Sequence, residues 1–207
     1  MLGPIVAVSL VLSALTAHAQ AQSALTIDCE NPTFAKDSSH ERLVAAFGKD
    51  NVTIVQEPGP KGMPPNVKSV IYPKDAKRRL EVSWHDGTSR ARPFSFNFEK
   101  PSQWVAPKGV RVGTTLEELE KLNGKPFHIA GFGGLRDGMA MFTGALDKAP
   151  GGCSVGGSLE TTVKLPKRTM DKISGDDDFP STHPIVRQAK PRLHQVDVVY
   201  QDERKTR

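Results

Sequence analysis

The stretch "GTTLEELEKLNGKP" (Gly113–Pro126) contains the start and the end of a short helix. Thr114 and Glu117 have the spacing of a capping box, in which two side chains bond the free N–H groups at a helix start. Gly124 stands where helices commonly end on a left-handed residue. Between these signals, one apolar face is expected from leucines spaced three apart, at Leu116, Leu119 and Leu122. We therefore expect a short amphipathic helix that packs on other structure.

The same signals occur earlier in the chain, in "SSHERLVAAFGKDN" (Ser38–Asn51). An offset of 76 residues (114 − 38) aligns the cap, the acidic residue and the final glycine: Ser38 with Thr114, Glu41 with Glu117, and Gly48 with Gly124. Such self-similarity is typical of a repeated folding unit. The sequence therefore predicts two tandem units, residues 38–108 and 109–207, each with one helix and an antiparallel sheet.

Segments typical of β-strands follow each predicted helix. They are "NVTIVQE", "VKSVIYP", "RLEVSWH" and "PFSFNFE" in the first unit, and "FHIAGFG", "MAMFTG", "LETTVKL" and "LHQVDVVYQ" in the second. In "PFSFNFE" the alternation places Phe94, Phe96 and Phe98 on one face of a half-buried strand. A parallel α/β fold needs helices between most strands, and the sequence offers too few. The predicted fold class is α+β, with an irregular insertion near residues 166–192 and a frayed tail after Tyr200.

Residues 1–19 are typical of a signal peptide. An apolar run from Ile5 to Leu15 precedes two possible cleavage patterns, which end at Ala19 and Ala21. A buried N-terminal helix is the alternative, but the segment lacks the polar face of such a helix. Residues 20–37 are expected to be an extended N-terminal segment. We expect an exported protein, periplasmic or secreted, with no membrane anchor, since no cysteine stands at the cleavage point.

The chain has two cysteines, Cys29 and Cys153. In an oxidising compartment they would form one disulfide, closing a loop of 124 residues (153 − 29). A metal site or a reactive thiol is the alternative. Neither cysteine belongs to a CxxC motif or lies near a histidine cluster, which favours the disulfide.

The composition and the spacing of residues limit the classes of ligand that the protein is expected to bind. The net charge is +5, and 6% of the residues are aromatic. The charges are spread along the chain, whereas nucleic-acid binding needs a basic stripe interleaved with aromatic residues, so no nucleic acid is expected. No metal and no cofactor are expected, because the histidines lack ligand spacing: His40, His85, His128, His183 and His194. "GDDDF" (Gly175–Phe179) could attract a cation, but three adjacent aspartates favour a solvated loop.

The sequence "RVGTTLEELEKLNGKPF" resembles the helix-to-strand junction of the small outer-membrane lipoprotein family, the SmpA/OmlA (BamE) type. It is also similar to tandem β-lactamase-inhibitor-like modules, which share the threonine cap, the short helix and Gly-x-Pro. With "HIAGFGG" after it, it looks closest to uncharacterised exported bacterial proteins that carry "LNGKPF" and then "GFG". This resemblance implies a non-enzymatic α+β module that contacts other proteins.

Four residues are candidates for such contacts. "GFGGLRDG" (Gly131–Gly138) could be a dinucleotide-binding loop, but a strand rather than a helix is expected after it, which favours a hairpin or bulged turn. Arg136 and Asp137 would then be exposed at its tip, beside Phe132. Trp104, between prolines in "KPSQWVAPKG", is a surface candidate, although tryptophans are more often buried.

One segment offers an enzymatic alternative. Gly152–Gly156, "GCSVG", matches Gly-x-Ser-x-Gly, so Ser154 could be the nucleophile of a serine hydrolase. That motif needs a helix after the serine, and "SLETTVKL" is β-like instead. The sequence therefore predicts an exported, non-catalytic module that binds an unknown envelope or extracellular protein. The alternatives are an envelope serine hydrolase using Ser154 and a structural envelope component.

Overall fold

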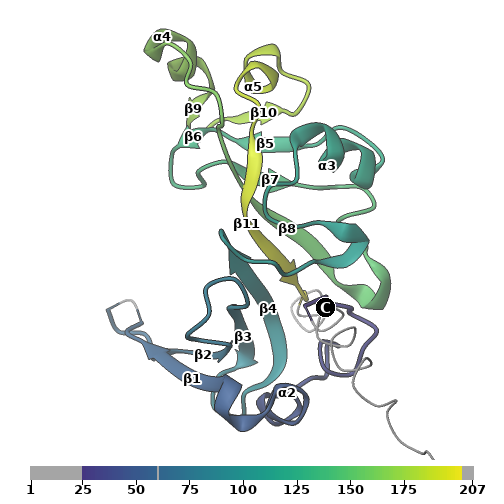
Figure 1. The fold of residues 1–207 in the computed structure, drawn as a ribbon. Helices are drawn as coiled ribbons and strands as arrows, with labels where there is room; N and C mark the ends of the chain where they lie inside the picture. The colour runs from purple at the N-terminus through teal and green to yellow at the C-terminus, as the bar shows by residue number, and fades with distance from the viewer. Residues whose placement is uncertain (1–24, 60, 202–207) are drawn as a thin grey trace, which may run out of the picture.

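The structure of this chain is a computed structural model that describes residues 25–59 and 61–201. The predicted signal peptide (1–19) and residues 202–207 of the predicted frayed tail lie outside the described residues. The described part mixes short helices with a mostly antiparallel sheet, as Figure 1 shows, so the predicted α+β class is confirmed.

The helices are α2 (His40–Phe47), α3 (Leu116–Asn123), α4 (Lys167–Met170) and α5 (Pro184–Gln188), with 3-10 turns η1 (Lys49–Asn51), η2 (Pro107–Gly109), η3 (Pro150–Gly152) and η4 (Asp171–Ile173). The strands are β1 (Val52–Glu57), β2 (Asn66–Ile71), β3 (Leu80–Asp86), β4 (Ala91–Glu99), β5 (His128–Ala130), β6 (Phe132–Gly133), β7 (Met139–Met141), β8 (Ser154–Glu160), β9 (Ser174–Gly175), β10 (Asp178–Pro180) and β11 (Arg192–Val199).

One nine-stranded sheet organises the molecule. Its strand order is β1-β2-β3-β4-β11-β8-β7-β5-β10, and all its pairings are antiparallel. The first four strands follow chain order, and the strands of the second half follow in the reverse order β11, β8, β7, β5. The two halves therefore join through β4 and β11, which pair from Gln195↔Glu99 to Val199↔Ser95. The short strands β6 and β9 form a separate parallel pair.

Both predicted helices form and end at the predicted glycines, but each begins one residue later than the predicted caps. Thr115, not Thr114, is the N-cap of α3, and it forms a capping box with Glu118. Ser39, not Ser38, caps α2 by accepting from the N–H of Arg42. The predicted caps are wrong because Ser38 and Thr114 turn inward and are buried. Gly124 ends α3 in the predicted left-handed conformation (φ 79°, ψ 0°), whereas the same prediction is wrong for Gly48, which has φ 85° but an extended ψ of 144°.

A β-bulge changes the face of one predicted residue. The ladder between β3 and β4 pairs Ser83 with Ser95 but Trp84 with Pro93, which leaves Phe94 as the extra residue. Phe96 and Phe98 point into the core as expected, whereas Phe94 is 47% exposed. The predicted row of three rings is therefore wrong at Phe94, because the bulge reverses the alternation at that point.

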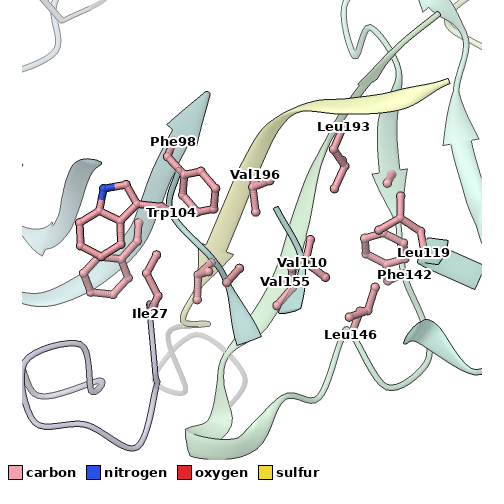
Figure 2. Close-up of a cluster of buried hydrophobic side chains, with 14 of the residues drawn as sticks. Ile27, Phe98, Trp104, Val110, Leu119, Phe142, Leu146, Val155, Leu193 and Val196 are labelled. Carbon is pink, nitrogen blue, oxygen red and sulfur yellow. The ribbon is translucent and has the colours of Figure 1, made fainter. Parts of the chain in front are cut away.

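The core lies against one face of the sheet and continues across the junction of the two halves. Figure 2 shows Phe98 and Val196 side by side from the paired strands β4 and β11, with Val155 of β8 beyond them. The predicted disulfide is confirmed: Cys29 and Cys153 are bonded, with their Cα atoms 6.4 Å apart, and both are buried. It fastens the segment before α2 to the turn before β8.

Two segments differ from their predicted form. The N-terminal segment, residues 20–37, is expected to be extended, and residues 20–24 of it lie outside the described residues. Residues 25–37 contain mainly turns, and Thr26 makes one parallel bridge to Val105. Residues 166–192, expected to be irregular, contain α4, η4, β9, β10 and α5. These elements are too short for a clear periodic signal, and pairing with β5 and β6 supplies their order.

Candidate functional site

Two of the four predicted contact residues are buried. Trp104 is 0% exposed, its Nε1 donates to the Arg78 carbonyl at 2.6 Å, and its ring lies 6.0 Å from that of Phe34. Its predicted surface position is wrong, because the ring turns from a proline-flanked loop into the core. Phe132 is 8% exposed in β6 and packs with the core. Neither ring is accessible to a partner in this structure.

The other two, Arg136 and Asp137, lie in a turn that we call the Leu135 loop (residues 133–138). It joins β6 to β7, as predicted for "GFGGLRDG", and no helix follows it. Asp137 Oδ1 accepts from the N–H of Gly133 at 2.8 Å, which closes the loop on itself. Asp137 is exposed and Arg136 is half-buried. The expectation of a turn at this position is confirmed; contact with a partner stays a prediction.

A second segment holds the Leu135 loop in place. It is the acidic segment (residues 174–178), which comes from the region predicted as an insertion. Arg136 Nη2 donates to the Asp176 carbonyl and to Asp178 Oδ1, each at 2.8 Å. Asp176 Oδ1 accepts from the N–H of Leu135 at 2.9 Å. Asp176 and Asp178, predicted from the sequence to lie in a solvated loop, thus accept hydrogen bonds from Arg136. The same arginine is predicted to be available to a partner.

Glycines allow the two segments to meet backbone to backbone. A Cβ at Gly134 would lie 2.4 Å from the carbonyl oxygen of Gly175, and one at Gly131 would lie 2.7 Å from the same atom. Any larger residue at either position must push the acidic segment away. Together with the four hydrogen bonds, this close approach fixes the conformation of the Leu135 loop.

The fixed loop presents one apolar side chain, Leu135, which is 95% exposed. Exposed leucines are common on protein surfaces, but a rigid turn that projects one differs from a mobile loop tip. Asp176, which accepts from the N–H of Leu135, and Asp137, two positions further along the chain, are exposed, and Arg136 supplies the opposite charge. Leu135 is not among the contact residues predicted from the sequence. The feature that could have indicated its exposure is its place as a leucine inside a turn rich in glycine and aspartate. The arrangement suits insertion of Leu135 into an apolar pocket with a basic rim.

Ser154 does not have the geometry of a nucleophile elbow. It begins β8, and its Oγ donates to the Asp147 carbonyl at 2.7 Å. The chain continues as a strand to Glu160, where the elbow requires a helix. The hydroxyl group of Ser154 therefore fastens the turn before β8.

A charge cluster across β1, β2 and β3 has a structural role. Lys68 Nζ lies 2.9 Å from Glu57 and 3.2 Å from Glu81, and Arg79 Nη2 lies 2.6 Å from Glu81. Burial acts to raise the pKa of Glu81, but the hydrogen bonds from Arg79 and Lys68 outweigh it and lower that pKa. A carboxyl group held ionised in this way bridges β2 and β3 and is unsuited to act as an acid near neutral pH.

Within residues 25–59 and 61–201, three or more His, Cys, Asp or Glu side chains do not gather in a way that could hold a metal ion. The helices in this part of the chain are all too short or too polar to cross a membrane.

Comparisons with known proteins assign the chain to no family. The resemblance of Gly113–Pro126 to outer-membrane lipoproteins and inhibitor-like modules therefore stays a prediction. No protein-family model, no curated protein and no solved structure matches the chain.

Proposed function

We propose that this chain is an exported, non-catalytic module that binds another protein through the Leu135 loop. One observation carries the proposal: a 95% exposed leucine stands on a turn that hydrogen bonds and glycine packing hold in one conformation. Partners bind rigid apolar anchors well because little conformational entropy is lost on association. An inhibitor-like or adaptor-like role would use such a loop.

Export is part of the proposal and has two supports. Residues 1–19 have the sequence pattern of a signal peptide, and the Cys29–Cys153 disulfide is formed in the structure. Structural disulfides persist in oxidising compartments such as the bacterial periplasm. We therefore propose that the protein acts in the periplasm or outside the cell.

We also propose that the chain consists of two tandem units. The order β1-β2-β3-β4 followed by β11-β8-β7-β5 is what two four-stranded units give when their last strands pair antiparallel. The N-caps support the same relation, since Ser39 bridges to Ala91 at the start of β4, and Thr115 bridges to Arg192 at the start of β11. In each unit the helix start thus meets the start of the last strand.

Affinity capture from envelope extract, with the purified protein as bait, tests the main proposal. Leu135→Ala should weaken capture of the partner by roughly tenfold or more, the usual effect of removing a central apolar anchor. Met63→Ala is the matched control, because Met63 is an apolar side chain that is 66% exposed on another loop. A partner retained equally by both variants would rule out the loop as its contact. A bait that captures nothing reproducibly would contradict the binding function itself.

The hydrolase alternative has a separate test. A fluorophosphonate probe that labels the folded wild type, but not Ser154→Ala, would establish a nucleophile at Ser154 and overturn the non-catalytic proposal. We expect no labelling, since Ser154 Oγ donates to a backbone carbonyl and no helix follows it.

A further inference from the structure

A groove of about 540 Å³ lies where the N-terminal end of α3 meets the start of β11. Its frame is rigid. The N–H of Gly113 donates to the Leu193 carbonyl at 2.7 Å, and the N–H of Leu193 donates to the Thr114 carbonyl at 3.0 Å. Thr114 Oγ1 also closes the turn from Arg111, donating to its carbonyl at 2.7 Å. The groove is therefore formed in the free protein.

Four cationic side chains line this groove: Lys108, Arg111, Lys121 and Arg192. All four are exposed, and none forms an ion pair with a carboxylate among the residues that the structure describes. They contrast with Arg136, Arg187 and Lys68, whose charges are bonded to aspartate or glutamate. None of these four charges is thus neutralised by a salt bridge among the described residues.

The groove is lined by a single carboxylate, that of Glu118, which already accepts a hydrogen bond within the fold. Its Oε2 accepts from the N–H of Thr115 at 2.8 Å as part of the capping box. Hydrogen bonds from Thr115, backbone first, lower the pKa of Glu118, and the charges of Arg111 and Arg192 act in the same direction. Four cations and one carboxylate leave a net charge of three in one concavity.

We propose that this groove binds a phosphate-bearing ligand. A phosphate ester brings a charge of about −1.5 to −2 and three acceptor oxygens in a small volume, whereas a carboxylate brings only one charge. The planar guanidinium groups of Arg111 and Arg192 match phosphate oxygens in bidentate fashion. Val112 and Leu122, both half-buried in the lining, offer an apolar surface to the rest of the ligand. The groove has the size of a small-molecule site.

This inference is independent of the Leu135 loop, because the two sites share no residue. Inorganic pyrophosphate is the first probe, titrated into the purified protein by calorimetry. We expect saturable binding that weakens as salt is raised. The double variant Arg111→Gln/Arg192→Gln should weaken it by roughly tenfold or more, the loss expected for two charge-assisted hydrogen-bonding groups.

Lys74→Gln/Lys77→Gln is the matched control, since it also removes two exposed cations, from the loop between β2 and β3. It should change the affinity by less than about twofold, because both variants have the same net charge. Equal weakening by the two variants would mean attraction to the overall charge and would overturn the site. Absence of saturable binding at low salt would overturn it as well.

Two further arms identify the source of the phosphate. Sedimentation with phosphatidylglycerol vesicles, but not with phosphatidylcholine vesicles, and competition by pyrophosphate would assign the groove to a lipid head group. Pyrophosphate binding without vesicle binding would assign it to a soluble phosphate ester. A glutamate-rich peptide that binds more tightly than pyrophosphate would overturn the choice of phosphate.

Discussion

The hydroxyl group of Tyr200 donates to the backbone carbonyl of Phe34 at 2.9 Å, and the two residues are 166 positions apart. The same oxygen lies 3.4 Å from the Cys29 carbonyl. Tyr200 directly follows β11, and its ring is buried. One phenol therefore ties the end of the central strand to the segment that carries the disulfide.

Removing this hydroxyl group should destabilise the protein. Tyr200→Phe leaves buried carbonyl groups without their donor, at a cost of about 1–3 kcal/mol. Burial, followed by Asp28 and Asp37, raises the pKa of Tyr200 well above its usual value. The unfolded chain therefore loses the proton first, and stability should fall as pH rises above about 10. Urea unfolding from pH 8 upward should show this loss in wild type and a smaller one in Tyr200→Phe; equal pH profiles would contradict it.

The disulfide should contribute more than any single hydrogen bond. It closes a loop of 124 residues, which the chain-entropy model equates with up to about 4–5 kcal/mol. Cys29→Ser/Cys153→Ser should lower the urea midpoint by a corresponding amount, and reductant should lower that of wild type alone. A midpoint that reductant leaves unchanged would show that the loop constrains the unfolded chain little.

His40 should make stability depend on pH. Its Nδ1 lies 2.8 Å from Ser69 Oγ, and Trp84 Nε1 donates to that oxygen at 3.1 Å, so the serine proton is free for a neutral His40 ring. Burial, followed by Arg90, lowers the pKa of His40, against the opposite effect of Glu41.

Because the native pKa of His40 is lowered, the unfolded state binds the proton more readily, and stability falls as pH drops below about 6.5. His40→Gln should lose less stability than wild type between about pH 7 and pH 5, as measured by urea unfolding. Parallel losses in the two proteins would assign the effect to other groups.

Glu120 should hold α3 to α5 and to the segment before α5. Its two carboxylate oxygens accept from Ser181 Oγ at 2.6 Å and from Arg187 Nη2 at 2.7 Å. Glu120→Ala leaves Ser181, which is buried, without its acceptor and should cost about 1–3 kcal/mol. Glu117→Ala, an exposed glutamate on the same helix, should stay within about 0.5 kcal/mol of wild type. Amide hydrogen exchange at Ser181 should be faster in Glu120→Ala and unchanged in Glu117→Ala. Such a result would place the loss of stability at the contact between Glu120 and Ser181.

Local patterns predict the elements of this fold better than its side-chain directions. The leucine spacing and Gly124 predict α3, because helix signals lie within the helix itself. The inward turn of Trp104 and the exposed ring of Phe94 depend on contacts with other segments. Trp104 Nε1 donates to the Arg78 carbonyl. Phe94 points to solvent because it is the extra residue of the bulge between β3 and β4. The first contact joins residues 26 positions apart and the second lies between two neighbouring strands, but neither leaves a periodic pattern in the sequence.

The candidate site shows the same division. The glycines of "GFGGLRDG" predict a turn, and the turn forms. Arg136 is bonded to the acidic segment, which lies some 40 residues later in the chain. No local sequence pattern connects the two segments. The exposure of Leu135 is a result of that contact and of the meeting of Gly134 with Gly175. Both become visible only when the two segments are placed side by side.

The middle strand of the sheet, β11, is the last strand in chain order within the part that the structure describes. β11 lies between β4 and β8, so neither half can join the other until residues 192–199 have left the ribosome. Until then β4 and β8 each present an unpaired edge, the kind of surface on which chains aggregate. A chain that stops short of β11 would lose the pairings that join the two halves of the sheet.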